Sequence, residues 1–552
     1  MLGPRLRAAT VLGAALALLA APAPGTAEPV GSAGPDLPVA EPVLVPMFAG
    51  SPGMDPTGGA GTQADPTSVT GTSRPSGSWE ASAIPSTSDV PGPAGPATSG
   101  SASTPSPRAS ADPAESEPIE AEPSTSASGA SPGDEGAQPT DPGLGAPLDP
   151  DAVVSEVRPL LTGGALGAGR TPGHIVDVAT GEVLLASRAS QPTTPASVMK
   201  LVTAVSVLDA LGPDAVLRTR TIILDADATV ARVVIVGAGD PSLRSTGTKV
   251  GGTGTSLTPA SLQELADATA RALAARGIER VRIGYDDSLF TGPSLHPTWS
   301  TSFPAAGIVA PVSALQVDQG RRTPRGISRV ADPAAAAART FAEQLERSTL
   351  RVTGKPKQVA ERADSVPLAS VASPTIGVLV ERTLATSDND YAESLARLAA
   401  AASGHPASFD GVAARAEALL DTLGIETDGA AFADGSGLSR SDELSPTMVT
   451  ALLRLTSTRF GAVASGLPVA AATGSLRNRY DTAATAAAAG VVRAKTGTLT
   501  GVVGLAGYAS RPDGRLLAFA ILDDSVPGGA AGGRAAVDRA LAALLECDCA
   551  VP

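Results

Sequence analysis

The stretch Pro195-Ala-Ser197-Val-Met-Lys200-Leu-Val-Thr-Ala-Val-Ser-Val-Leu-Asp-Ala210 joins a short polar motif to an almost wholly apolar continuation. Its Leu and Val residues predict a helix over about 196–210 that is buried on all sides and is stopped by Gly212-Pro213. Ser197 and Lys200 are three residues apart and therefore lie on the same face of this helix. Because burial favours the neutral form of a lysine, we expect Lys200 to accept a proton from Ser197.

Two further motifs follow in order along the chain, Ser387-Asp388-Asn389 and Lys495-Thr496-Gly497. The chain has only five Lys and two Asn, so this ordered combination is seldom a coincidence. Ser-x-x-Lys, Ser-x-Asn and Lys-Thr-Gly together are typical of a serine acyl-transferase that works without histidine. Each motif alone has a plainer interpretation: a helical turn, an Asx cap for a helix beginning at Asp390, and an edge lysine that deters aggregation.

The second motif lies in a predicted break between two helices. A loop serine such as Ser387 can pass a proton between Lys200 and a leaving group. The amide of Asn389 can bond both a lysine and a substrate amide. The unpaired amides at the start of the Ser197 helix can stabilise an oxyanion.

The third motif is expected on a strand at the edge of a sheet, entered from Val491 to Ala494. A peptide substrate could add to this edge as a further strand. Lys495 and the hydroxyls of Thr496 and Thr498 would then hold a carboxylate, and Gly497 would let the ligand approach closely.

The sequence also predicts how the chain is divided. Arg5 and Arg7 before the apolar run Ala8–Ala21 predict an export signal over 1–27, with an uncleaved anchor as the alternative. Residues 28–150 are rich in Pro, Ser, Thr, Gly and Ala, which predicts a disordered linker. Its single Gly-x-Ser-x-Gly match, Gly129-Ala-Ser131-Pro-Gly133, lacks the flanking strand and helix of a nucleophile elbow and is interpreted as chance.

The rest of the chain mixes helices and strands, so that the predicted fold class is α+β. We expect strands at 174–178, 183–186, 230–236, 281–284, 502–509 and 516–522, and helices at 261–276, 334–347 and 533–545.

Composition excludes some functions. A formal net charge of -14 without a Lys/Arg run argues against a nucleic-acid partner. The three histidines, His174, His296 and His405, are remote from the two cysteines, so no metal site is expected. Cys547 and Cys549 are interpreted as a local disulfide or two free thiols without a catalytic role.

Four more stretches carry a resemblance to a known family. They are Gly237-Ala-Gly-Asp240-Pro-Ser-Leu243, Asp286-Asp-Ser-Leu-Phe290, Ala310-Pro-Val-Ser-Ala-Leu315 and Asp434-Gly-Ser436-Gly-Leu438-Ser-Arg440. With the three motifs, they resemble the class C low-molecular-mass penicillin-binding proteins, the D-alanyl-D-alanine carboxypeptidase/endopeptidase family of serine peptidases, over about residues 155–545.

The resemblance implies a penicillin-binding-protein or serine β-lactamase-like transpeptidase domain, with helices on an antiparallel sheet, and an inserted α+β domain. Applied to this chain, the catalytic domain comprises 151–217 and 366–552, and the inserted domain 218–365.

The same resemblance implies roles for single residues. Ser197 corresponds to the acyl-ester nucleophile, Lys200 to the base, and Ser387 and Asn389 to the second catalytic element. The implied substrate-binding residues are Lys495, Thr496, Gly497, Thr498, Leu438 and Arg440. The amides of Ser197 and Thr498 correspond to the oxyanion hole, and no cofactor or metal is implied.

The implied function is that of an exported serine D,D-carboxypeptidase or D,D-endopeptidase acting on peptidoglycan stem peptides and acylated by β-lactam antibiotics. Association with the membrane surface or cell wall is a further expectation. Two alternatives are a β-lactamase of similar fold, which the inserted domain and the Asp434–Arg440 stretch disfavour, and a non-catalytic cell-wall scaffold, which the intact catalytic residues disfavour.

Overall fold

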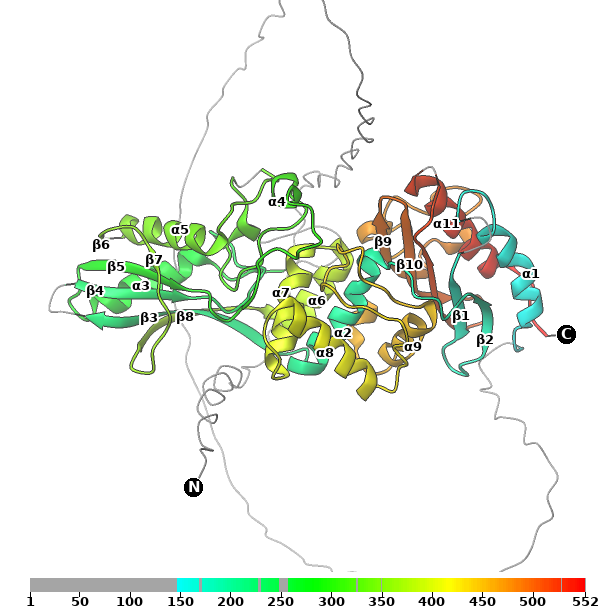
Figure 1. Ribbon diagram of the computed structural model, residues 1–552, viewed down its shortest axis with the longest axis horizontal. Helices are drawn as coiled ribbons and strands as arrows, with labels where there is room; N and C mark the ends of the chain where they lie inside the picture. The colour runs from blue at the N-terminus through cyan, green and yellow to red at the C-terminus, as the bar shows by residue number, and fades with distance from the viewer. Residues whose placement is uncertain are drawn as a thin grey trace, which may run out of the picture. The chain divides into compact units, whose positions relative to one another are not determined.

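The computed structural model describes residues 146–167, 171–226, 230–247, 257–323, 326–348, 350–527 and 529–551. All of them belong to one compact unit of the chain. The predicted export signal, the Gly129–Gly133 match and the predicted linker as far as residue 145 lie outside the described residues. Two sheets with their helices form the described part, so the predicted α+β class is confirmed (Figure 1).

The first sheet is fully antiparallel, with strand order β2-β1-β11-β10-β9. Its strands are β1 Gly173–Asp177, β2 Val183–Ser187, β9 Val492–Leu499, β10 Val502–Ser510 and β11 Leu516–Asp523. The predicted hairpin at 174–186 and the two predicted strands after residue 500 are therefore present. β9, which carries the third motif, is the edge strand that the sequence predicts.

Helices cover both faces of this sheet. α1 Pro150–Leu161 and α11 Ala530–Glu546 lie on one face, and the other face packs on a helical layer (Figure 1). That layer consists of α2 Lys200–Leu211, α6 Ile376–Thr386, α7 Asn389–Ala402, α8 Phe409–Thr422, α9 Pro446–Thr456 and the short α10 Gly461–Gly466. Neighbouring strand residues enter opposite cores, as Leu505 and Ala506 of β10 do, because side chains alternate along a strand.

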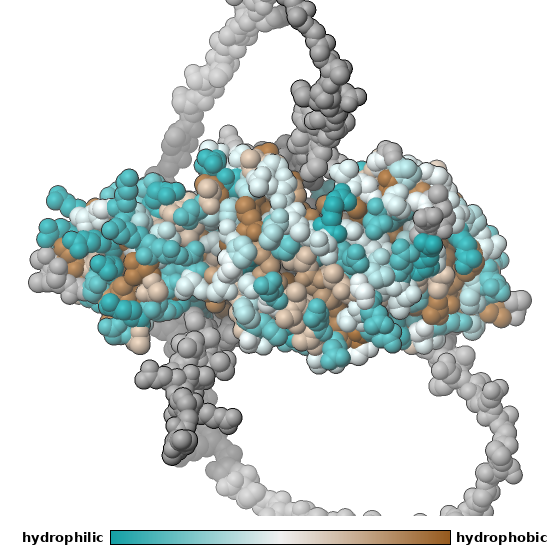
Figure 2. All heavy atoms as spheres, viewed as in Figure 1, coloured by the Kyte–Doolittle hydropathy of each residue, from teal (hydrophilic) through white to brown (hydrophobic). Residues whose placement is uncertain are grey.

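The second sheet has the order β6-β5-β4-β3-β8, with β7 also paired to β5. Its strands are β3 Val216–Ala226, β4 Val230–Val236, β5 Arg280–Asp286, β6 Arg351–Val352, β7 Lys357–Gln358 and β8 Val366–Thr375. The helices α3 Leu262–Ala274 and α5 Pro333–Arg347 contribute to its core, and the short α4 Phe303–Ala306 lies in the connection after β5. Hydrophilic residues are prominent on the surface over this sheet, at the left of Figure 2.

Two predicted boundaries need correction. The expected end of the inserted domain at residue 365 precedes β8, yet β8 pairs with β3 in the second sheet, so that sheet extends to Thr375. The expected linker end at 150 is too late, since Leu148 is buried and pairs with Ala550. Pro-rich composition misled here, because Pro150 is the first residue of α1 and Asp149 caps it.

Cys547 and Cys549 form a disulfide, one of the two states expected for them. Within the described ranges, no helix is long and apolar enough to span a membrane.

Candidate active site

Ser197 lies on a short 3₁₀ helix, η2 Ala196–Met199, which leads directly into α2. Ala196, immediately before it, has φ 45°, in the left-handed region that residues other than glycine seldom adopt. The half-buried Ser197 hydroxyl lies 2.9 Å from Lys200 Nζ, within hydrogen-bond distance. Backbone strain of this kind persists only where surrounding packing fixes the chain, as it does at many functional sites.

Lys200 is completely buried and lies at the centre of the site. Besides Ser197 Oγ, its Nζ contacts Asn389 Oδ1 at 2.8 Å and the Ser436 carbonyl oxygen at 2.6 Å. Burial lowers the pKa of Lys200 to about 8, and the nearby acidic side chains, Asp434 foremost, oppose a further fall. An amine with such a pKa is partly neutral near pH 7, as the sequence predicts.

The partners of Lys200 determine the direction of its lone pair. An amide oxygen and a backbone carbonyl can only accept hydrogen bonds, so Asn389 and Ser436 receive the two N–H groups of the neutral amine. The lone pair then faces Ser197 Oγ, the remaining contact and the only one with a proton to give. The arrangement can therefore accept the serine proton.

The second motif forms the junction of α6 and α7. Ser387 ends α6 in the left-handed conformation, with φ 57°. Asp388 is the N-cap of α7 and accepts from the Tyr391 amide, so Asn389 is not the cap that the plainer interpretation required. Asn389 is instead the first helical residue, and its side chain is free to bond Lys200.

The third motif approaches the first two from β9. Lys495 is completely buried, and its Nζ donates to Ser387 Oγ and to the Thr496 carbonyl, each at 2.8 Å. Burial lowers the pKa of Lys495 well below its usual value, and the positive charge of Lys200 lowers it further. The Thr496 hydroxyl lies 2.8 Å from the Ser475 hydroxyl, and the Thr498 hydroxyl donates to the Gly497 carbonyl at 2.7 Å.

Gly497 packs closely against the turn that carries Ser197. A Cβ at this position would lie 2.5 Å from the Pro195 carbonyl oxygen, and a Cβ on Gly504, its partner in β10, would lie 3.2 Å from the same oxygen. The glycine pair thus lets η2 pack directly on the sheet. The expected close approach of a ligand at Gly497 stays a prediction.

The Asp434–Arg440 stretch lines the site from the helical side. Asp434 accepts the amides of Ser436, Gly437 and Ser439 and the indole N–H of Trp299, all within 2.9 Å. This network presents the Ser436 carbonyl to Lys200.

Leu438 and Arg440 leave that stretch in different directions. Leu438 packs against an apolar cluster that includes Trp299 and Phe409. Arg440 is exposed, and its guanidinium donates to the Thr500 carbonyl, just beyond the end of β9.

Known proteins resemble this chain in sequence and in fold. The sequence model described as the D-Ala-D-Ala carboxypeptidase 3 (S13) family matches residues 154–326 and 322–544. This chain belongs to that family. It is similar to carboxypeptidase DacB of Mycolicibacterium smegmatis, with 34% identity over 425 residues that cover 74% of this chain and 88% of the relative. A carboxypeptidase of Mycobacterium tuberculosis is 31% identical over 388 residues, 69% of this chain and 81% of the relative.

Among solved structures, penicillin binding protein 4 of Haemophilus influenzae has the same fold as this S13 chain. The TM-score is 0.58 at 19% identity, covering 72% of this chain and 98% of the other. The S13 family consists of serine peptidases, so the chain is a hydrolase of the D-Ala-D-Ala carboxypeptidase type.

In this S13 chain, hydrogen bonds join Lys200 to Ser197 and Asn389 in one set, and Lys495 to Ser387 in a second set. The second motif supplies one residue to each set, Asn389 to the first and Ser387 to the second. Leu438 and Arg440 lie outside both sets.

Sequence reasoning missed three contributors: the carbonyl of Ser436, the carbonyl of Ile308, which accepts from Asn389 Nδ2 at 2.9 Å, and the hydroxyl of Ser475. Two of these are backbone groups, which carry no side-chain signature. Over the described ranges, no group of three or more His, Cys, Asp or Glu side chains could hold a metal ion.

Proposed function

We propose that this chain is an exported serine D,D-carboxypeptidase and D,D-endopeptidase that cleaves D-alanyl-D-alanine and D-Ala cross-link bonds of peptidoglycan through an acyl-Ser197 intermediate. One observation carries the proposal: Lys200 Nζ lies 2.9 Å from Ser197 Oγ, while two acceptor-only oxygens occupy its other contacts. Family membership supplies the reaction class, and this geometry supplies a base without histidine.

The first chemical step transfers the Ser197 proton to the Lys200 lone pair. The Ser197 oxygen forms a bond to the carbonyl carbon of the penultimate D-alanine, and the carbonyl electrons move to its oxygen. We assign the oxyanion to the amides of Ser197 and Thr498, the former at the start of a helix and the latter on the β9 edge. Collapse breaks the C–N bond, and the terminal D-alanine leaves as its amine after gaining, through Ser387, the proton that Lys200 took from Ser197.

The second chemical step is hydrolysis of the ester. A water molecule gives a proton to Lys200 and attacks the acyl carbon, and Ser197 regains its proton when it leaves. Lys200 thus accepts a proton in each half-reaction and returns it in each.

The β9 edge is the proposed binding site for the peptide. Residues 468–470 cover the outer edge of β9 at its start, where Ala470 donates to the Val492 carbonyl and Ala494 donates to the Pro468 carbonyl. Along an edge strand, the backbone N–H and C=O groups of every second residue point outward. Those of Val492 and Ala494 are bonded to residues 468–470, so the next outward groups, on Thr496 and Thr498, are left for a peptide. A stem peptide added there would have its terminal carboxylate near Lys495 and the hydroxyls of Thr496 and Thr498.

An anionic carboxylate beside Lys495 would raise the pKa of this lysine again, because an opposite charge favours the ammonium form. Leu438 and Arg440 are proposed to border the rest of the peptide, as the stretch that contains them flanks both η2 and the end of β9.

β-Lactams are proposed to acylate Ser197. Penicillin binding protein 4 of Haemophilus influenzae, which shares this fold, has been solved with a β-lactam. The test is incubation of the purified chain and its Ser197→Ala variant with fluorescent penicillin. We expect one covalent adduct on the wild type and none on the variant, and equal labelling of both would refute the proposal.

Turnover distinguishes the activities. D-Alanine release from a monomeric pentapeptide measures carboxypeptidase action, and cleavage of a cross-linked dimer measures endopeptidase action. Rapid hydrolysis of nitrocefin with no release of D-alanine would instead favour a β-lactamase.

Export is proposed through residues 1–27, with residues 28–145 as a tether that holds the enzyme near the membrane surface or cell wall. We also propose that the catalytic and inserted regions are separate domains. The mature N-terminus determined by mass spectrometry, in cell and culture fractions, tests whether the first segment is cleaved or retained as an anchor.

A further inference from the structure

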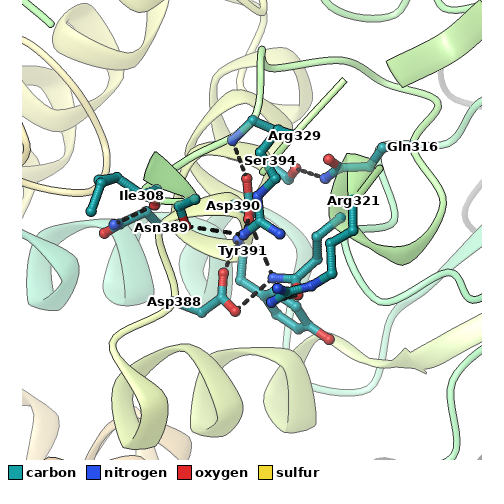
Figure 3. Close-up of polar contacts among 12 residues, drawn as sticks. Ile308, Gln316, Arg321, Arg329, Asp388, Asn389, Asp390, Tyr391 and Ser394 are labelled. Carbon is teal, nitrogen blue, oxygen red and sulfur yellow. Dashed lines mark hydrogen bonds and ion pairs between the residues drawn. The ribbon is translucent and has the colours of Figure 1, made fainter. Parts of the chain in front are cut away.

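The second motif contacts two parts of the chain. Its Asn389 and Ser387 side chains contact Lys200 and Lys495 in the catalytic centre. Together with the next residue, Asp390, the motif also contacts residues 307–323 and 326–330 of the inserted region (Figure 3). Three consecutive residues make the second set of contacts. Asp388 Oδ2 accepts from Gln319 at 2.6 Å, Asn389 Nδ2 donates to the Ile308 carbonyl at 2.9 Å, and Asp390 Oδ1 accepts from the Ala310 amide at 2.6 Å.

A buried ion pair strengthens this junction. Arg329 Nη2 lies 2.7 Å from Asp390 Oδ2, and the two side chains are only 4% and 2% exposed. The same Nη2 lies 3.5 Å from the Gly307 carbonyl, and the Arg329 amide donates to the Pro304 carbonyl at 2.8 Å. The guanidinium therefore connects the first turn of α7 to the loop that immediately precedes Ile308 (Figure 3).

The Ile308 carbonyl determines how the Asn389 amide is oriented. With Nδ2 donating to this carbonyl, Oδ1 faces Lys200 and accepts one of its N–H groups. The reversed amide would place its NH₂ against the lysine N–H and its oxygen against the Ile308 carbonyl, and neither contact could be a hydrogen bond. An acceptor at this place is what directs the lysine lone pair to Ser197.

We propose that Arg329 and Asp390 are positioning residues whose buried ion pair fixes residues 307–310, so that the Ile308 carbonyl orients the Asn389 amide toward Lys200. The inference rests on the proposed function, since it concerns the same reaction. In this proposal, the inserted region helps to activate Ser197 through the Ile308 carbonyl.

The experiment compares four variants of the full chain with the wild type. Arg329→Met removes one partner of the pair, Arg329→Lys keeps the charge, and Arg329→Met/Asp390→Met replaces both partners by apolar side chains. Arg515→Met is the matched control, because Arg515 pairs with Asp177 at 2.9 Å with similarly low exposure, 6% and 3%, in the catalytic domain. Each protein is assayed for thermal unfolding, for penicillin acylation rate and for kcat and KM on a pentapeptide.

We expect Arg329→Met to lower the acylation rate and kcat by about 100-fold, the effect of a small misplacement at a reacting group, with KM nearly unchanged. Arg329→Lys recovers most of the rate, because only one guanidinium nitrogen contacts Asp390. The double variant recovers thermal stability without recovering the rate, since an apolar pair removes the buried unpaired charge but not the misplacement. Arg515→Met loses stability and keeps its rate.

Two results would overturn the inference: a double variant that is folded and acylated at the wild-type rate, or an Arg515→Met variant whose rate falls as far as that of Arg329→Met. Should Arg329→Met fail to fold, the double variant still decides the question. Absence of acylation in the wild type would instead contradict the proposed function itself, so the two failures are distinct.

Discussion

Lys495 Nζ lies 2.8 Å from Ser387 Oγ and donates to it, although 108 residues separate them in sequence. Because the lysine supplies the hydrogen in this contact, the Ser387 hydroxyl keeps its own proton for another acceptor. A departing D-alanine amine needs such a proton. Ser387 can deliver it and regain the proton that Lys200 took from Ser197, while the bond from Lys495 holds the Ser387 hydroxyl in place. In the proposed mechanism, the third motif thus has a role in proton transfer in addition to its proposed binding of a carboxylate.

The pH dependence of acylation should follow Lys200. Burial lowers its pKa to about 8, and only the neutral amine can take the Ser197 proton. The second-order rate constant for penicillin acylation is therefore expected to rise about tenfold per pH unit below this pKa and to level off above it, as a single free-enzyme base requires. Stopped-flow or quenched labelling from about pH 5.5 to about pH 9.5 gives the profile. A rate independent of pH would contradict a neutral lysine base.

Close packing at Gly497 should make this position intolerant of any side chain. In Gly497→Ala, the new Cβ would lie 2.5 Å from the Pro195 carbonyl oxygen, which is backbone and cannot move aside without shifting η2. We expect a loss of stability of roughly 1–3 kcal/mol, typical of overpacking, together with strongly reduced acylation. Gly461→Ala is the control, because nothing lies within 4 Å of a Cβ at that position. Thermal unfolding and penicillin labelling of both variants check the prediction, which fails if they behave alike.

Much of the site could be predicted because Lys and Asn are rare in this chain and because its helices follow simple hydrophobic patterns. The apolar run after Lys200 predicted a helix buried on all sides, and residues Lys200 to Leu208 are indeed all buried. The strands expected at 502–509 and 516–522 are present as β10 and β11, which position the edge strand β9.

Other features of the site and of the fold have no recognisable pattern in the sequence. The Ser436 and Ile308 carbonyls are backbone groups, and only tertiary packing brings them to Lys200 and Asn389. No strand was predicted at 366–375, and these residues were placed in the catalytic domain. Most residues of β8 are exposed or half-buried, so no alternation marks it as a partner of β3. The carboxyl groups near Lys200 come from α7 and from the loop before α9, elements whose contact no local pattern reports.

Ser475 is expected to take part in substrate binding. Its hydroxyl lies 2.8 Å from that of Thr496, beside the proposed carboxylate site. Ser475→Ala should raise KM for a pentapeptide by about two- to tenfold with kcat little changed, the loss expected for one neutral hydrogen bond worth roughly 0.5–1.5 kcal/mol. Ser465→Ala is a suitable control, since Ser465 bonds Glu381 and the Gly461 carbonyl on α10 instead. A lower kcat at unchanged KM would contradict a role in binding.

Glu393 should make the free energy of unfolding depend on pH, and Glu393→Gln should remove this dependence. Its side chain is completely buried beneath Lys200, and burial, with a smaller contribution from Asp434, raises its pKa from 4.5 to about 8. The folded chain therefore keeps a proton that the unfolded chain releases. The resulting stability is fully present below pH 4.5 and is lost progressively as the pH rises to about 8.

Glu393→Gln imitates the protonated form and keeps an acceptor for the Gly435 amide. This variant is expected to match the wild type in stability near pH 4.5, the ordinary value of the group, and to exceed it by several kcal/mol near pH 8, where the wild type has lost the contribution. Its acylation rate should remain close to that of the wild type, because the three contacts of Lys200 are unchanged. Chemical denaturation at both pH values measures the difference, with Glu426→Gln, an exposed position, as the control. Parallel stability curves for Glu393→Gln and the wild type would mean that Glu393 is ionised in the folded chain at neutral pH.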